Sequence, residues 1–185
     1  GRFSDDASTT PTNTDGSTSR SCGIKIMEWN IRHSINKNEK ELRNLLSKND
    51  IDVAFLTEVD QEDIRGNFSV PGYLTIYPER KPDKEKDNIR IVCLTKRSKT
   101  LTFTTLKDLM DNRIPSIWVE ARTLLGKRYT IGGFYREWTS DGESTVEAQV
   151  DKAQILAEQI GRACDKCPRV VIVGDANLCS ESWNG

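Results

Sequence analysis

Several short apolar runs in this 185-residue chain end in polar side chains of the kinds that handle phosphate groups and metal ions. The clearest is the run Val-Val-Ile-Val at 170–173, which leads through Gly174 into Asp175 and Asn177. Four consecutive β-branched residues predict a strand that is buried on both faces. The i, i+2 spacing places the carboxylate and the carboxamide on one side of an extended chain. Because Gly-Asp and Asn are also common turn formers after a strand, this run alone supports either a functional or a structural interpretation.

Three further runs repeat this pattern, and they end in Asn30, in Glu58, and in Tyr135 with Arg136. Each of these residues has a structural alternative, which is an Asx turn, a solvated strand end or a plain strand rim. Together, however, they supply a set of complementary groups. Carboxylates are hard oxygen ligands that suit Mg²⁺, which is usually shared with a substrate phosphate. Amide, phenol and guanidinium groups can orient the phosphate. The set predicts metal-assisted hydrolysis of a phosphodiester.

The periodicity of apolar residues predicts the elements that carry these side chains. Strands are expected over 23–32, 51–56, 73–77, 89–95, 116–121, 128–134 and 170–173. Helices are expected over 38–48 and about 145–164, and the longer helix has an apolar stripe that includes Val150, Ile160 and Ala163. The first strand, helix and returning strand are typical of a compact α/β unit, whereas the hairpin spacing that follows predicts an antiparallel sheet.

Composition limits the class of protein. The formal net charge of −1 argues against a protein that grips nucleic acid by charge alone, but it is compatible with a local basic patch and a metal. No run of about 18 apolar residues exists, so we expect no transmembrane helix and no membrane partner. Residues 1–22 lack hydrophobic periodicity and are expected to be a disordered leader without a secretory signal, which leaves one domain over 23–185.

The five cysteines predict reduced intracellular thiols rather than a disulfide framework, because their number is odd and their spacing is irregular. Cys93 lies within an apolar run and is expected in the core. Cys164 and Cys167 form the one close pair, and no second pair accompanies them, which argues against a zinc site.

The sequence resembles the endonuclease/exonuclease/phosphatase superfamily over about residues 23–180. The resemblance is carried by the motifs Glu28-Trp29-Asn30-Ile31-Arg32, Leu56-Thr57-Glu58, Gly133-Phe134-Tyr135 and Gly174-Asp175-Ala176-Asn177. Within this superfamily it is similar to the apurinic-type endonuclease domain at the N-terminus of non-LTR retrotransposon polyproteins, in which a reverse transcriptase follows. The resemblance implies an α/β fold, a four-layered sandwich of two mostly antiparallel sheets flanked by helices.

The resemblance also implies a role for each site residue. Glu58 would ligate Mg²⁺, with Mn²⁺ as a possible substitute, and Asn30 would help to hold metal or phosphate. Tyr135 would contact the scissile phosphate, Asp175 would align or deprotonate the attacking water, and Asn177 would stabilise the developing charge. The implied reaction nicks one strand of a DNA substrate and leaves a 3′ hydroxyl that primes reverse transcription. The implied location is intracellular and nuclear, and no obligate protein partner is inferred.

Two departures from the family pattern shape the expectations. Arg136 follows the tyrosine where the family usually has Ala or Val before Pro, so Arg136 is a further candidate for contact with DNA phosphate. The family's terminal Ser-Asp-His motif is absent, and the single histidine, His33, does not match it. We therefore expect a C-terminally truncated domain whose last strands are missing, with an exposed edge that favours aggregation and with little or no nuclease activity. A phosphoesterase acting on lipid or inositol phosphates and a non-catalytic relic remain as alternatives.

Overall fold

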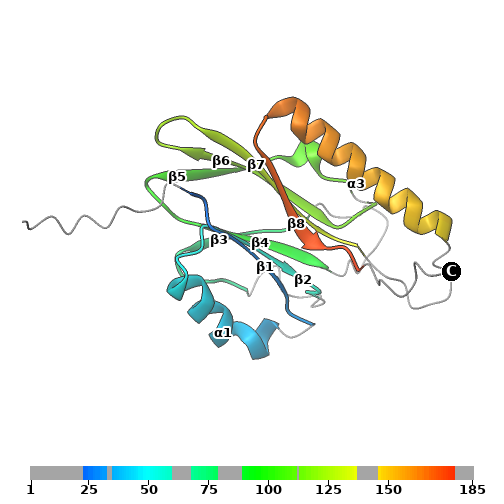
Figure 1. The fold of residues 1–185 in the computed structure, drawn as a ribbon. Coiled ribbons are helices and arrows are strands. Elements are labelled where there is room, and N and C mark those ends of the chain that lie inside the picture. The colour runs from blue at the N-terminus through cyan, green and yellow to red at the C-terminus, as the bar shows by residue number, and fades with distance from the viewer. Residues whose placement is uncertain are drawn as a thin grey trace, which may run out of the picture.

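The computed structural model describes residues 23–32, 35–59, 68–78, 89–111, 113–136 and 146–177. Within these ranges the chain forms two four-stranded sheets that face each other (Figure 1). The first has the strand order β1-β2-β4-β3, with β1 (Ile26–Asn30), β2 (Val53–Thr57), β3 (Tyr73–Ile76) and β4 (Ile91–Lys96). The second has the order β5-β6-β7-β8, with β5 (Leu101–Thr105), β6 (Ser116–Thr123), β7 (Arg128–Tyr135) and β8 (Val170–Asp175).

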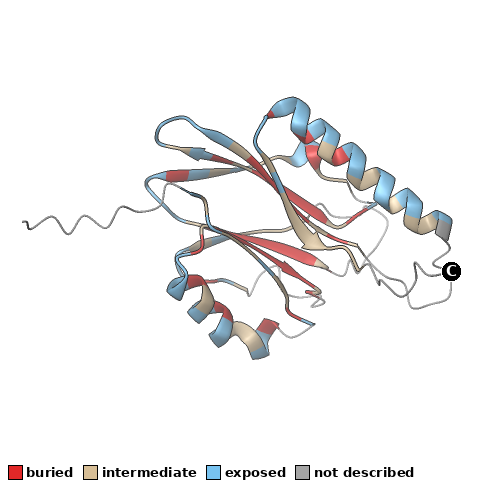
Figure 2. Cartoon of the chain, viewed as in Figure 1, coloured by how far each residue is buried: buried red, intermediate tan, exposed pale blue. Residues whose placement is uncertain are grey.

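A helix covers the outer face of each sheet, which makes four layers (Figure 1). The helix α1 (Ile35–Lys48) buries Leu42 and Leu46 against the first sheet. The helix α3 (Val146–Lys166) and the short 3₁₀-helix η1 (Lys107–Leu109) cover the second sheet around Trp118. A central apolar core fills the space between the sheets, and buried residues are concentrated along the strands (Figure 2). The predicted four-layered α/β sandwich is confirmed.

The strand pairing explains why polar strand ends gather in one place. The pairs β1–β2 and β7–β8 are parallel, and the other four pairs are antiparallel, as expected for mostly antiparallel sheets. Parallel pairing aligns the carboxyl ends of neighbouring strands. In register, Asn30 pairs with Thr57 and Tyr135 pairs with Asp175.

Three details differ from the sequence-based expectation. The strand β8 is not buried on both faces: most of its residues are half-buried and Val171 is 38% exposed, because β8 lies at a sheet edge and no strand of the described part pairs with its far side. In α3 only the second half packs firmly, so Val150, expected in the apolar stripe, is 57% exposed. The strand β5 was not predicted at all.

Further expectations concern the cysteines, membrane-spanning helices and the N-terminal leader. Cys93 is buried in the core as predicted, and Cys93, Cys164 and Cys167 are free thiols. Among the residues that the structure describes, no helix is long and apolar enough to cross a membrane. The expected leader over 1–22 and His33 lie outside the described residues.

Candidate active site at the paired strand ends

The two sheets bring the ends of β1 and β8 together at one rim of the sandwich. The side-chain amide of Asn30 donates a hydrogen bond to Oδ2 of Asp175 at 2.9 Å, across the space between the sheets. The backbone N–H of Asn177 donates to the other oxygen, Oδ1, also at 2.9 Å. Both carboxylate oxygens of Asp175 are therefore held in fixed positions by residues that were predicted to share its site.

Asn177 joins this group to the end of β7. Its side-chain amide donates to the carbonyl oxygen of Arg136 at 2.6 Å, and it also hydrogen-bonds to the hydroxyl of Tyr135. Asn177 has a φ of 45°, which is uncommon for a residue other than glycine and is typical of positions that a functional site over-determines. The structure thus places Asn30, Tyr135, Asp175 and Asn177 in one connected cluster.

Tyr135 is a buried phenol at the centre of the rim. Burial raises its pKa above the ordinary value, and the carboxylates of Glu58 and Asp175 act in the same direction. The guanidinium of Arg90, 5.2 Å from the ring centroid, and the hydrogen bond to Asn177 partly oppose the increase in pKa. Tyr135 therefore keeps its proton at neutral pH and can donate a hydrogen bond to a phosphate oxygen.

Glu58 begins the segment after β2 and also has a positive φ, 54°. Its electrostatic influence on Tyr135 places it on the same rim as Asp175. The short β2, whose residues are all buried, fixes where this carboxylate emerges. Sequence reasoning therefore placed Glu58 correctly at a strand end, and its role as a metal ligand stays a prediction.

Arg136 lies differently from the other candidates. Its Nε donates to Oε1 of Gln149 at 2.8 Å, and its guanidinium also donates to the carbonyl oxygen of Ala176 at 3.3 Å. These contacts tie β7 to α3 and to the segment after β8. The contact of Arg136 with DNA phosphate stays a prediction, since its donors here already serve the protein itself.

Two residues of the rim were not assigned a role from the sequence. Glu28, two residues before Asn30, accepts a hydrogen bond from the hydroxyl of Thr57 at 2.9 Å. Burial raises the pKa of its carboxyl, the Thr57 hydrogen bond opposes this, and the nearby Asp175 raises the pKa further. Arg90, over the Tyr135 ring, is the second. Glu28 stands in the first motif that carries the family resemblance, and the sequence signal for Arg90 was a charged residue interrupting an apolar run.

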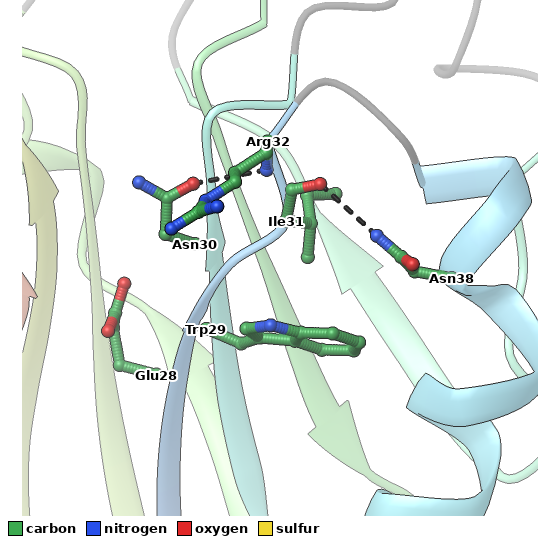
Figure 3. Close-up of a pocket in the computed structure, with 6 residues that line it drawn as sticks. All are labelled: Glu28, Trp29, Asn30, Ile31, Arg32 and Asn38. Atoms are coloured by element: carbon green, nitrogen blue, oxygen red, sulfur yellow. Dashed lines mark hydrogen bonds between the residues drawn. The ribbon is translucent and has the colours of Figure 1, made fainter.

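A hollow of about 560 Å³ opens beside β1 and is lined by Glu28, Trp29, Asn30, Ile31, Arg32 and Asn38. Glu28 and Asn30 lie on one side of β1 and Trp29 extends from the other, toward α1 (Figure 3). The backbone N–H of Arg32 donates to Oδ1 of Asn30 at 3.1 Å. This second bond fixes the amide of Asn30 so that its NH₂ group faces Asp175.

The oxygen donors at this rim fit a hard divalent cation. Glu58 and Asp175 supply carboxylates and Asn30 supplies an amide oxygen, and Mg²⁺ is commonly held by only one or two carboxylates together with water and substrate phosphate. Among the described residues no three His, Cys, Asp or Glu side chains cluster closely enough to form a complete metal cage.

The fold and this rim define a phosphodiester-hydrolase type of sandwich. The chain belongs to the endonuclease/exonuclease/phosphatase family, whose family model matches residues 27–185. No curated protein sequence matches the chain.

Solved structures of several activities share the fold. The endonuclease domain of TRAS1, a telomere-specific non-LTR retrotransposon, has a TM-score of 0.59 at 17% identity, over 87% of this chain and 62% of its own. The human Nocturnin catalytic domain has a TM-score of 0.59 at 14% identity, over 84% and 65%. The 3′ phosphatase NExo from Neisseria, bound to a DNA hairpin, has a TM-score of 0.53 at 17% identity, over 88% and 64%. The chain thus spans somewhat less than two thirds of each relative.

Proposed function

We propose that this chain is the DNA-nicking endonuclease domain of a non-LTR retrotransposon, with a reverse transcriptase downstream in the parent protein and Mg²⁺ as the cofactor. The observation that carries the proposal is the hydrogen-bonded cluster of Asn30, Asp175, Asn177 and Tyr135 at the meeting of the two sheets. The similarity to the TRAS1 endonuclease domain supports it at the level of the fold.

In the proposed reaction, water attacks the phosphorus atom and the bond from phosphorus to the 3′ oxygen breaks. Asp175 takes a proton from the attacking water, and its two anchored oxygens keep the carboxylate aimed during that transfer. Tyr135, protonated at neutral pH, donates to a non-bridging phosphate oxygen. The amide of Asn177 lies beside it and stabilises the developing negative charge.

Glu58, with help from Asn30, would hold the proposed cation, which would supply Lewis-acid stabilisation of the negative charge on the phosphate and on the departing 3′ oxygen. Tyr135 is in electrostatic reach of both this carboxylate and Asp175. The 3′ oxygen takes a proton from solvent water as it leaves, which gives the 3′ hydroxyl that a reverse transcriptase extends.

The test is nicking of supercoiled plasmid with Mg²⁺ by this chain and by a form extended downstream through any Ser-Asp-His motif. We expect nicking by the extended form, abolished by chelation and strongly reduced by D175N, and little or none by this chain. Activity in neither form on DNA, with hydrolysis of a lipid or inositol phosphate, would favour a phosphoesterase. Activity on none of these substrates would favour a non-catalytic relic.

A further inference from the structure

The end of the sandwich opposite the candidate active site carries a cluster of cations. Because β7 runs from Arg128 to Tyr135, the tip of the β6–β7 hairpin lies about 23 Å from the rim, at about 3.3 Å per residue. A hollow of about 290 Å³ opens between this tip and the turn that joins α3 to β8. Its lining holds no acidic residue and four cationic ones, Lys127, Arg128, Lys166 and Arg169.

These four side chains are exposed and can meet an outside anion. Arg128 pairs with Glu120 at 2.5 Å, and Lys166 pairs with Asp108. The Lys166–Asp108 pair is exposed on both sides, and such a pair contributes only about 0–1 kcal/mol and exchanges readily for a stronger anion. Arg128 is held more firmly, since it donates two hydrogen bonds to Glu120, whose side chain is only 12% exposed. Arg169 lies over the ring of Tyr129 at 5.9 Å, and Lys127 forms no ion pair within the described part of the chain.

We propose that this hollow, the distal basic site, binds the phosphate backbone of a duplex DNA segment separate from the one at the active site. A concave site directs several cations toward one phosphate row, which carries one charge per about 1.7 Å of duplex. The formal net charge of the chain is only −1, so a cluster of four cations is a local feature of this end. The choice of DNA as the duplex rests on the proposed function.

Two other anionic partners fit the distal basic site less well. Single strands are usually held by stacking on aromatic side chains, and none lines the hollow. The hairpin tip offers a bilayer two projecting leucines, Leu124 and Leu125, which are 73% and 87% exposed, and two leucines make a small apolar face for insertion. A duplex presents a convex row of phosphates that enters a recess.

The consequence for the molecule is contact with two DNA segments. The rim handles the strand that is cut, while the distal basic site holds a second stretch about 23 Å away. Both contacts can be made by two segments of one duplex or by two neighbouring duplexes.

The test measures binding of a labelled 20-base-pair duplex by fluorescence anisotropy, in EDTA so that nothing is cut. We expect the variant K127E/R169E to bind at least about tenfold more weakly at low salt and to lower the salt slope of log K by about 2, since two phosphate contacts are lost. Circular dichroism checks folding, and K127Q/R169Q, a milder pair, repeats the measurement if the first variant unfolds.

The matched control is K40E/R43E, which makes the same change in net charge on exposed positions of α1 in the opposite outer layer. We expect it to keep most of the affinity. Equal losses in both pairs, no loss in either, or binding by the wild type to anionic phosphatidylserine vesicles in place of the duplex would overturn the proposal. The binding assay measures no cleavage. Failure of the nicking assay would therefore not change the binding result, and loss of binding at the distal basic site would not change the nicking result.

Discussion

Glu28 shows how the rim controls ionisation at the level of single residues. Burial and the nearby Asp175 raise its pKa above the ordinary value, although the Thr57 hydroxyl opposes them. In the unfolded chain the carboxyl titrates near its reference pKa of about 4.3. Between that pH and the raised native pKa, the native state keeps a proton that the unfolded state releases, so stability falls as pH rises through this window.

Below about pH 4 we expect the difference in unfolding free energy between E28Q and the wild type to be constant. As pH rises to 7, we expect E28Q to become more stable relative to the wild type. The amide cannot ionise, and its carbonyl oxygen can still accept the hydrogen bond from Thr57. The gain is at most about 1 kcal/mol, because solvent screens an exposed carboxyl. Urea unfolding in EDTA at several pH values measures it. E41Q, an exposed change on α1, is the control, and parallel curves for E28Q and the wild type would refute the argument.

Asp175 is the residue whose loss should matter most for chemistry. The substitution D175N keeps the shape and can still accept from Asn30, but it removes the group that takes the proton from water. We expect nicking by the active extended form to fall by about 10²–10⁴-fold without loss of folding. The control is D151N, an exposed change on α3. Full activity of D175N would show that another group is the base.

The sequence predicted which strand ends carry polar groups but not how they meet. Asn30, Glu58, Tyr135, Asp175 and Asn177 each follow an apolar run, which is a local signal. The hydrogen bond between Asn30 and Asp175 joins residues 145 positions apart, and it depends on the approach of two sheets that no local pattern encodes. The same approach gives Glu28 its raised pKa, and for this reason its place at the rim was missed.

At the scale of whole elements, the pattern of apolar residues predicted strands correctly where a strand is buried on one face or on both faces. The strands β2 and β4 are almost wholly buried and were predicted from their apolar runs. The strand β5 was missed because only two of its five residues, Leu101 and Phe103, are apolar, so its apolar alternation is short. The exposure of β8 was misjudged because a continuous apolar run does not reveal whether a strand is central or at an edge.

The close approach of the two sheets depends on glycine in β7. A Cβ at Gly133 would overlap the ring of Phe55, which is fully buried in β2. We expect G133A to destabilise the fold by about 1–3 kcal/mol through overpacking. The matched control is G161A in α3, where nothing lies within 4 Å and the helix should gain about 1 kcal/mol. Chemical denaturation compares the two, and a G133A variant as stable as the wild type would mean that the sheets can separate at no cost.

At the scale of the whole molecule, the described sandwich has unpaired strand edges, and two of them belong to β1 and β8. The strands β1 and β8 are edge strands of their sheets, and these edges lie beside each other (Figure 1). Half-buried apolar residues of the central core, including Ile24, Ile26 and Val173, occur along this side. An unpaired edge strand with an exposed apolar residue, such as Val171 of β8, is a template for pairing with another chain.

We expect this chain to associate as its concentration rises, and V171K to reduce that association, because Val171 is the exposed apolar residue of β8 and a lysine at an edge disfavours strand pairing. Light scattering across a concentration series measures the effect. The control is V150K, which replaces an even more exposed valine on the helix α3 with the same charge. Equal reduction by both variants would attribute the association to general surface hydrophobicity, and a greater reduction by V171K would locate it at the β8 edge.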